Sequence, residues 1–259
     1  MVQRRAVKST MRTFEVLELF AERREPLHLN EIYTALGYPQ SSSTNLLKSM
    51  VMMGYLNYNR SNRTYLPTTR LISLGSWVPG YIQSAGGYRQ LVEELQRRTD
   101  ETVGLVTQND LFIQYIIFAT PTHKHQNAPP VGAMRMMVDS SSGLAMMAKM
   151  KDREIDKICR YSNYYELGDS ERISYEAILR EVEWVRHVGY SYAPNKPTQD
   201  VSSIAMALDS SLHGVPLAIG VGGLADRIAK HKVDIIDTMR ELIAEFSAGR
   251  FSAPQEEDN

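Results

Sequence analysis

The sequence has very little cysteine and no long hydrophobic run. Cys159 is the single cysteine among 259 residues, which excludes an intramolecular disulfide and a zinc site built on cysteines. The longest run of apolar residues and glycine, Leu217–Ala225, is far shorter than a membrane-spanning helix. Glu15 and Glu18 interrupt any signal-peptide core. With 43% hydrophobic residues the composition is that of a globular protein, and we expect a cytoplasmic one without membrane contact.

Motifs of the common enzyme classes are also missing. The sequence contains no Gly-x-Ser-x-Gly, no phosphate-binding P-loop and no His-Glu-x-x-His. His123 and His125 lie in a proline-rich stretch, where two solvated loop histidines are more common than a metal site. The glycines of Gly220–Gly223 fit a tight turn or close ligand approach better than a nucleotide-binding loop. We therefore expect no enzyme, and neither a metal nor a cofactor.

The net charge is −1, but the charges are unevenly distributed along the chain. Residues 1–75 hold ten Lys or Arg and five Glu, whereas the remainder of the chain is acidic overall. A small basic part joined to a larger acidic part is typical of a protein of which one part binds a polyanion such as DNA. Charge alone is weak evidence, so the basic part must also contain a binding motif.

Residues 8–68 have the pattern of a winged helix-turn-helix domain, because three short helices precede a two-stranded hairpin. Pro26 ends the first helix, Asn30 is a candidate N-cap for the second, and Gly37 fits its end. The predicted helices are 13–25, 31–36 and Pro39 to Gly54, and the predicted strands are 55–58 and 64–66.

The third of these helices has one face suited to the major groove of DNA. Ser41, Asn45, Lys48 and Met52 recur at helical spacing opposite the apolar stripe, and this face carries no carboxylate. Short polar side chains allow close approach, Asn can pair with adenine, and Lys can reach guanine or phosphate. A winged helix that binds another protein is the alternative. The candidate DNA-binding residues are Arg12, Gln40, Ser41, Ser42, Thr44, Asn45, Lys48, Arg60 and Arg63, the last two at the hairpin tip.

The segment after the hairpin is predicted to be a linker helix over 69–83, interrupted at Pro79-Gly80. Its apolar stripe either contacts a second subunit or packs on its own domain. This stripe consists of Leu71, Ile72, Leu74 and Trp77. We place the larger domain at 84–250 and expect the acidic tail, 251–259, to be disordered.

Residues 84–250 mix helical and strand patterns in the way that is typical of an α+β domain with a central, mostly antiparallel sheet. The expected helices are 88–99, 143–150, 152–161, 174–188 and 233–246. The expected strands are 102–108, 111–119, 204–208 and 217–221, with turns at Asn109-Asp110 and His213-Gly214.

A cluster of methionines and serines in this domain is a candidate ligand site. Methionines line adaptable apolar cavities, and Ser140, Ser141 and Ser142 offer hydroxyls and free amides to an anion. A methionine-rich core with an ordinary helix N-cap explains the same residues. The methionines are Met134, Met136, Met137, Met146, Met147 and Met206.

The chain as a whole resembles the IclR-type bacterial transcription regulators over residues 10–247. The first part is similar to their DNA-binding domain at Leu29–Gly37, Ser42–Leu47, Gly54–Leu56 and Tyr65–Pro67. The second resembles their GAF-like effector-binding domain at Gly132-Ala133, Ser142–Ala148, Val188–Tyr190, Val201–Ala205 and Val221–Gly223. The resemblance implies a homodimer or a dimer of dimers on a pseudo-palindromic operator, with a small-molecule effector that shifts DNA affinity.

The resemblance also implies an effector site. Its positions are Met134, Arg135, Met136, Ser140, Ser141, Ser142, Val201, Ser203, Gly220 and Gly222. Met136 stands where the family usually has proline, Leu144 where it has lysine, and glycines stand at two strand positions that often carry serine. Glycines would widen the site and make it less polar, which implies an aromatic or otherwise bulky organic acid and not a two- or three-carbon oxoacid. Arg135 either pairs with the carboxylate of that acid or lies on the surface.

The favoured hypothesis is a ligand-responsive regulator of a catabolic operon. Two alternatives stay open from the residues alone. One is an enzyme that modifies a small molecule and carries an accessory winged helix. The other is a scaffold that binds proteins and not DNA.

Overall fold

The computed structural model describes residues 7–78, 87–121, 130, 132–196, 199–212 and 214–251. These residues form two compact units, and the boundary between the units falls between residues 81 and 82. Each unit is described by itself. His123, His125, His213, the end of the expected linker helix and the tail from 252 onward lie outside the described residues.

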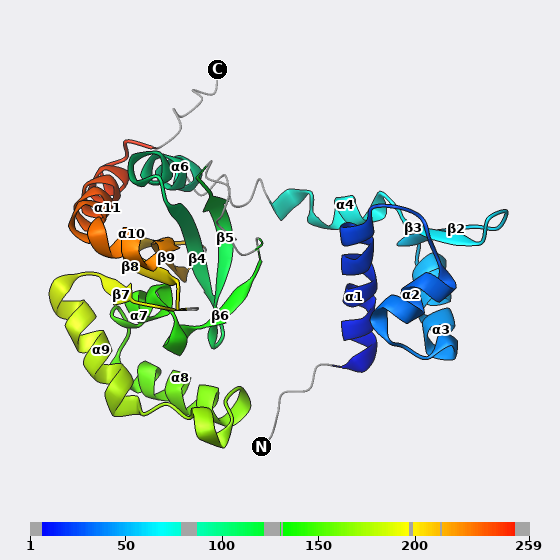
Figure 1. Ribbon diagram of the computed structural model, residues 1–259, viewed down its shortest axis with the longest axis horizontal. Coiled ribbons are helices and arrows are strands. Elements are labelled where there is room, and N and C mark those ends of the chain that lie inside the picture. The colour runs from blue at the N-terminus through cyan, green and yellow to red at the C-terminus, as the bar shows by residue number, and fades with distance from the viewer. Residues whose placement is uncertain are drawn as a thin grey trace. The chain divides into compact units, whose positions relative to one another are not determined.

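The N-terminal unit consists of short helices and a small antiparallel sheet (Figure 1). Its elements are α1 (Lys8–Arg23), β1 (Leu27–His28), α2 (Leu29–Leu36), α3 (Gln40–Met52), β2 (Leu56–Asn59), β3 (Thr64–Pro67) and α4 (Arg70–Gly75). The strand order is β1-β3-β2. Phe20, Ile32, Leu47 and Leu56 meet in its core, one from each of α1, α2, α3 and β2. The winged helix-turn-helix prediction is confirmed, with β1 as an addition.

Two details at the helix ends differ from the prediction. The first helix begins at Lys8 and ends at Arg23, because Arg24 takes the left-handed conformation with φ 55°. The second helix starts at Leu29, and His28, not Asn30, is its N-cap. The Glu31 carboxylate accepts a hydrogen bond of 2.6 Å from the His28 backbone amide. Gly37 ends this helix as predicted, with φ 67°.

The C-terminal unit is built on an antiparallel sheet of order β6-β5-β4-β9-β8-β7. Its strands are β4 (Thr102–Asn109), β5 (Phe112–Ala119), β6 (Met134–Met136), β7 (Ser191–Ala193), β8 (Val201–Leu212) and β9 (Val215–Leu224). Its α-helices are α6 (Tyr88–Thr99), α7 (Ser141–Met147), α8 (Asp152–Tyr165), α9 (Tyr175–Val188), α10 (Ala225–Lys230) and α11 (Lys232–Ser247). Short 3-10 turns, η1 (Met137–Asp139) and η2 (Asp169–Glu171), precede α7 and α9. The α+β prediction is confirmed.

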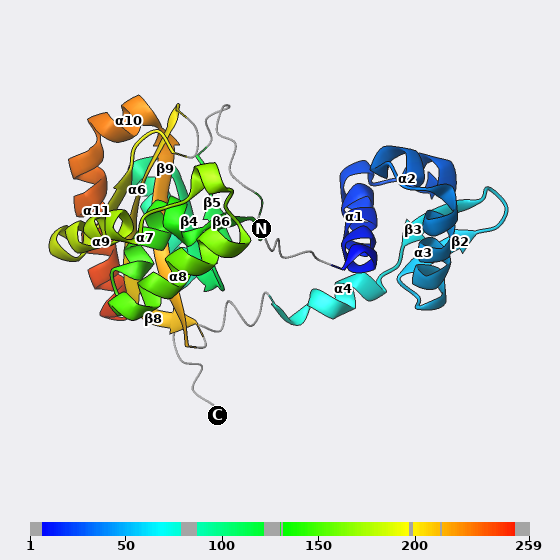
Figure 2. The ribbon, with the colours of Figure 1, turned by 90° about the horizontal axis from the view of Figure 1, so that it is seen from below.

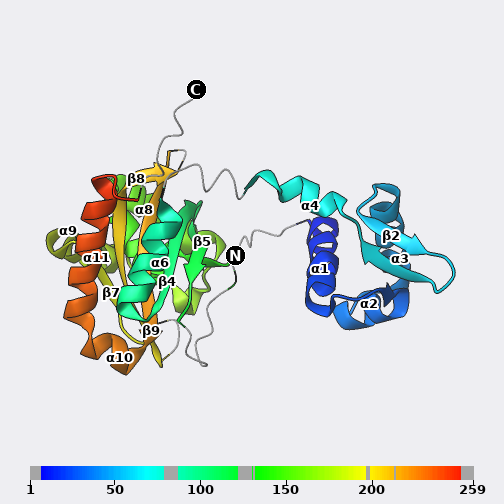
Figure 3. The same ribbon diagram turned by 90° about the horizontal axis from the view of Figure 1, so that it is seen from above.

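The helices cover the sheet from both sides. Helices α6, α10 and α11 lie on one face, and α7, α8 and α9 lie on the other (Figures 1 and 3). In Figure 2, which is seen from below, α8 and α9 lie in front of α7, and α7 lies next to the sheet. The predicted strands 204–208 and 217–221 are longer in the structure. The sequence reasoning missed β6, β7 and α10, which are short. It also placed the helix of residues 143–150 two residues late.

Residue alternation in β9 gives the two faces different character. Leu217, Ile219 and Val221 are fully buried or nearly so and pack with α6 and α11. Between them, Ala218, Gly220 and Gly222 face α7. On the side of α6 and α11, β9 therefore contributes branched apolar side chains to the core. On the side of α7, the same strand has almost no side chains. This second face holds the expected effector-site residues.

Candidate DNA-binding and effector-binding sites

The outward face of α3 is the one that the sequence predicts. Ser41, Asn45 and Lys48 are exposed, and Met52 is 83% exposed. The opposite side of the helix is buried through Ser43, Leu47 and Met50. The exposed face has no acidic residue, so nothing on it repels a phosphate backbone. An α-helix with this surface fits the width of the major groove.

Two of the candidate hydroxyls on α3 already have partners. Ser42 donates to the Pro39 carbonyl at 2.9 Å, and Thr44 donates to the Gln40 carbonyl at 2.8 Å. A phosphate oxygen only accepts hydrogen bonds, so these hydroxyls would have to leave the helix backbone to donate to one. The exposed candidate donors of α3 that need no such rearrangement are those of Gln40, Ser41, Asn45 and Lys48.

Arg12 lies beside the start of α3. Its guanidinium carbon is 4.5 Å from the centre of the Tyr38 ring, and the side chain is half-buried. Tyr38 precedes the first residue of α3 by two positions. The stacked ring therefore holds a positive charge near the N-terminal end of the candidate recognition helix.

Arg60 and Arg63 are exposed in the turn between β2 and β3. Side chains hold this turn. The Asn59 carbonyl oxygen Oδ1 accepts from the Ser61 amide at 2.9 Å, and the Asn62 Oδ1 accepts from the Thr64 hydroxyl at 2.8 Å. Arg63 has a left-handed backbone with φ 56°. The wing tip is thus a defined turn that carries two cations.

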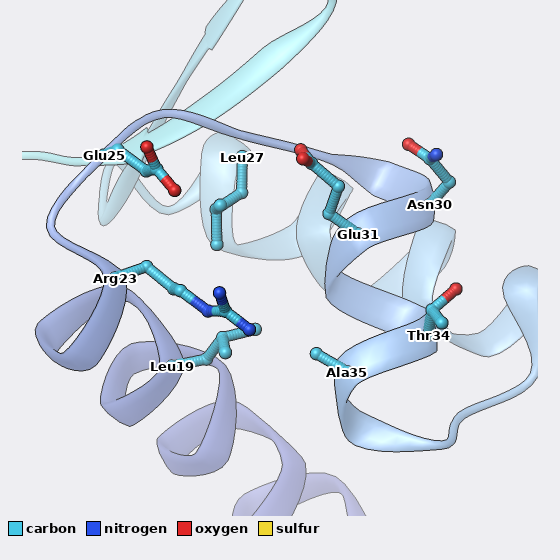
Figure 4. A pocket seen from close by; sticks show the side chains of 8 residues that line it. All are labelled: Leu19, Arg23, Glu25, Leu27, Asn30, Glu31, Thr34 and Ala35. Atoms are coloured by element: carbon cyan, nitrogen blue, oxygen red, sulfur yellow. The ribbon is translucent and has the colours of Figure 1, made fainter.

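A shallow depression lies between the end of α1 and the start of α2 (Figure 4). It has a volume of about 360 Å³. Leu19 and Leu27 form its apolar part, the Arg23 guanidinium lies within it, and Glu25 and Glu31 carry carboxylates at its margin (Figure 4). Its two carboxylates outnumber the one guanidinium, so the charge of this depression does not favour phosphate binding.

The three serines before and within α7 each have a different environment. Ser140 is the N-cap, and its Oγ accepts from the Gly143 amide at 3.0 Å. The Ser141 and Ser203 hydroxyls share a hydrogen bond of 2.8 Å. The sequence-based expectation of three available hydroxyls and free amides is therefore wrong for Ser140, because its oxygen and the Gly143 amide already satisfy each other.

Small residues of neighbouring strands form a continuous surface under α7. Gly104, Gly220 and Ala205 are paired across β4, β9 and β8, and Gly222 is paired with Ser203 in the next row. We call these five residues the small-residue surface. Ser203, Gly220 and Gly222 keep partial exposure although they lie in inner strands. Inner strands retain exposure only where no side chain covers them, so the sheet is open to solvent there.

The two strand glycines are not equivalent. A Cβ at Gly220 would lie 3.1 Å from the Ser142 hydroxyl oxygen, whereas a Cβ at Gly222 would find its nearest neighbours at 3.8 Å. The expectation that both glycines widen the site is therefore wrong for Gly220, because Ser142 lies directly above it. Only Gly222 has the space of an ordinary van der Waals contact.

Two aromatic rings of β5 border the small-residue surface, and the sequence reasoning missed both. The Tyr115 and Phe118 rings are stacked, with centroids 4.7 Å apart. A Cβ at Gly104 would lie 3.0 Å from the Phe118 ring and 3.1 Å from the Tyr115 ring. A bulge in the β4–β5 pairing turns both rings to the same face, although three positions separate them. Alternation alone predicts opposite faces, so the sequence gave no clear signal.

Arg135 lies close to Tyr115. Burial raises the pKa of the Tyr115 phenol, and the positive charge of Arg135 partly offsets that increase. Arg135 is half-buried and pairs across β5–β6 with the fully buried Ile113. Cross-strand partners share a face of the sheet, so Arg135 lies on the α7 side.

The remaining candidates spread over several environments. Met134 is 45% exposed on the edge strand, while Met136 and Val201 are half-buried. Met137, Met146 and Met147 are fully buried core residues beneath α8 and α9, and Met206 packs on the opposite face of the sheet. The methionine-rich core explains most of the cluster.

The described residues show neither a reactive thiol nor a cluster of metal ligands. Cys159 is buried, and burial raises the pKa of its thiol to about 11, so the thiol stays protonated at neutral pH. Among the described side chains, no three His, Cys, Asp or Glu come together as metal ligands. In the same part of the chain, no helix is both long and apolar enough to cross a membrane.

Comparison with known families accounts for both units. Residues 85–248 match the family described as "Bacterial transcriptional regulator IclR C-terminal", and residues 9–60 match the "IclR helix-turn-helix domain". The chain belongs to the IclR family of bacterial transcriptional regulators. The two matches contain α1 to β2 and the whole series from α6 to α11. The N-terminal unit is accordingly the DNA-binding helix-turn-helix domain of an IclR regulator.

Individual IclR-family proteins are similar over nearly the full chain. The HTH-type transcriptional regulator XynR of Escherichia coli is 23% identical over 228 residues, which cover 86% of this chain and 88% of XynR. The IclR structure of Thermotoga maritima has a TM-score of 0.70 at 17% identity and covers 93% of this chain and 98% of its own. An IclR homolog of Microbacterium hydrocarbonoxydans, solved with 4-hydroxybenzoate, has a TM-score of 0.67 at 20% identity, with coverage of 93% and 98%.

A substitution at Gly143 tests how closely α7 packs against η1. A Cβ at this position would overlap the Met137 carbonyl group and lie 2.5 Å from its Cα. We expect Gly143→Ala to lower the free energy of unfolding by about 3 kcal/mol, because η1 or α7 would have to move. Gly222→Ala is the matched control and should change stability by under about 1 kcal/mol. Chemical denaturation measures both, and equal losses would contradict the packing.

Proposed function

We propose that the chain regulates a catabolic operon by binding a pseudo-palindromic operator as a dimer or tetramer, and that an aromatic or otherwise bulky organic acid alters this binding. The observation that carries the proposal is the acid-free exposed face of α3 in an IclR helix-turn-helix domain. Effector binding would favour one of several conformations of the C-terminal unit and so change the spacing of two recognition helices.

In this proposal α3 reads bases and the wing contacts the backbone. Ser41, Asn45 and Lys48 face outward from α3, and their donors suit base edges in the major groove. Arg60 and Arg63 extend from the wing tip, where arginine forms strong contacts with phosphates. Gln40, Ser42, Thr44 and Arg12 lie at the first turns of α3 or beside them, where phosphate contacts set the register of the helix.

Replacement of Lys48 and Arg63 distinguishes the two kinds of contact. We expect Lys48→Ala to weaken binding to the specific duplex roughly tenfold and to lower the ratio of specific to scrambled binding. Arg63→Ala should weaken both duplexes alike and reduce the salt slope by about 1. Fluorescence anisotropy with DNA from upstream of the coding region, against a scrambled duplex over a salt series, measures both quantities.

Arg24→Gln is the control, because Arg24 follows α1 and lies outside the candidate DNA-binding residues. It should leave both affinities unchanged within about twofold. Equal losses for Lys48→Ala and Arg63→Ala on both duplexes would contradict the assignment of α3 as the base-reading helix.

Two exposed apolar stripes in the N-terminal unit support a dimer. Val7, Met11 and Phe14 follow one side of α1, with exposures of 67%, 45% and 59%. Ile72 and Trp77, in and after α4, are 70% and 61% exposed, so most of each side chain is open to solvent. Exposed apolar stripes of this kind are typical of subunit contacts. The linker stripe thus supports the first of the two interpretations of the sequence.

The subunit contact predicts a change of mass in solution. We expect the wild-type chain to sediment as a dimer or a larger assembly, and Trp77→Glu to shift it toward the monomer because a charge would be buried in the interface. Val233→Glu is a matched control, since Val233 is equally exposed, at 69%, on α11 of the other unit. Sedimentation equilibrium that gives one mass for all three proteins would contradict a contact through Trp77.

The proposed effector site is the small-residue surface with its aromatic border and Arg135. Gly222 and Ser203 are partly exposed and leave space beside them, and Tyr115 and Phe118 border the same surface with rings against which a flat ring can pack. Arg135 is available on the same face for the carboxylate, and Ser141 and Ser203 contribute hydroxyls. The 4-hydroxybenzoate complex of the Microbacterium homolog supports an aromatic acid as the effector class.

Calorimetry with a small panel of acids tests the effector class. We expect benzoate or 4-hydroxybenzoate to bind more tightly than pyruvate and to change operator affinity. Arg135→Gln should weaken binding of the aromatic acid roughly tenfold through loss of a charge-assisted hydrogen bond. Arg160→Gln, an exposed arginine of α8, is the control. Tight pyruvate binding, or an aromatic acid that binds without an effect on operator affinity or dimer geometry, would contradict the proposal.

A further inference from the structure

His28 joins the helix-turn-helix to the wing. Its backbone amide donates to the Glu31 carboxylate at 2.6 Å, which caps the start of α2. Its ring nitrogen Nδ1 lies 3.3 Å from the backbone carbonyl oxygen of Arg63. A carbonyl oxygen only accepts, so the hydrogen of this bond is on Nδ1. One residue therefore contacts both the first turn of α2 and the end of the wing turn.

The contact between the His28 ring and Arg63 lies next to the short pairing of β1 with β3, on the side of the wing tip. Strand β1 pairs with β3 only through Leu27 with Tyr65 and His28 with Thr64. Arg63 directly precedes β3, on the side of the wing tip. The His28 ring thus adds one interaction beyond the last backbone pair, at the point where the wing leaves the sheet.

Arg63 needs such support because of its backbone conformation. Its φ is 56°, in the left-handed region, which is unfavourable for a residue with a Cβ. A strained residue keeps such a conformation when neighbouring bonds fix it. The hydrogen bond to the Arg63 carbonyl and the Thr64–Asn62 hydrogen bond of 2.8 Å hold the two sides of this residue.

We infer that His28 is a positioning residue for DNA binding, which holds Arg63 in the left-handed conformation so that its guanidinium points toward the DNA backbone. The backbone conformation of Arg63 sets the direction of its Cα–Cβ bond, so a release of the carbonyl would redirect the side chain. The inference rests on the proposed function of the wing.

Serine and glutamine at position 28 separate this role from helix capping. Serine is a favoured N-cap and preserves the start of α2, but its side chain is too short to reach the Arg63 carbonyl. Glutamine has a side-chain N–H at a length that can restore the contact. We expect His28→Ser to weaken operator binding roughly threefold to tenfold and to leave the thermal stability unchanged. His28→Gln should recover at least half of the lost binding affinity, measured as the logarithm of Kd.

A double-mutant cycle tests whether His28 acts through Arg63. The His28→Ser/Arg63→Ala protein should bind operator DNA as Arg63→Ala does, within about twofold, because the positioned side chain is then absent. Fluorescence anisotropy at constant salt measures all four proteins. Two outcomes would overturn the inference and leave the proposed wing contact in place. In the first, Arg63→Ala weakens DNA binding but His28→Ser binds as the wild type does. In the second, the losses of affinity of the two single variants multiply in the double variant. An Arg63→Ala protein with wild-type affinity would overturn both.

Discussion

The close approach of α7 to the sheet is the constraint on which the C-terminal unit depends. Gly143 gives the helix room against η1, Ser142 lies directly over Gly220, and Ser141 reaches Ser203. Each contact requires a small residue on at least one side. A larger side chain at Gly220 would press on Ser142 of α7, and one at Gly143 would press on η1. Either change would displace α7 and loosen the buried core beneath α8 and α9.

The same constraint explains how one sheet supports both a rigid core and an open surface. In β9, Leu217, Ile219 and Val221 are branched apolar side chains that pack against α6 and α11. The residues between them lack bulk, so α7 covers part of that face closely and leaves Gly222 and Ser203 partly exposed. The side of the strand that faces α6 and α11 is filled by side chains, and the side that faces α7 keeps the space that the proposed effector site would use.

The extent to which sequence predicts this structure depends on how local each signal is. The order of helices and hairpin in the N-terminal unit follows from periodicity and from turn residues such as Gly37, whose signals lie within a few positions. The short elements β6, β7 and α10 escaped prediction because they are stabilised by neighbouring strands and helices. The wrong expectation for Gly220 has the same origin, since the residue above it, Ser142, is remote in sequence. Tyr115 and Phe118 share a face only because of a bulge.

Acidic residues are absent from α3 and the wing, whereas the rest of the N-terminal unit carries charges of both signs. Its glutamates lie on α1, in the segment after it and on α2, and α1 also carries three basic residues, while Lys48, Arg60 and Arg63 lie on α3 and the wing. In the proposed complex, α3 and the wing would therefore attract phosphate without an opposing carboxylate. Within the attractive surface, Ser42 and Thr44 donate to the helix backbone. In the proposed complex, base recognition by α3 would consequently rest on fewer side chains than its polar sequence suggests, and Asn45, with both a donor and an acceptor, is the one best suited to distinguish bases.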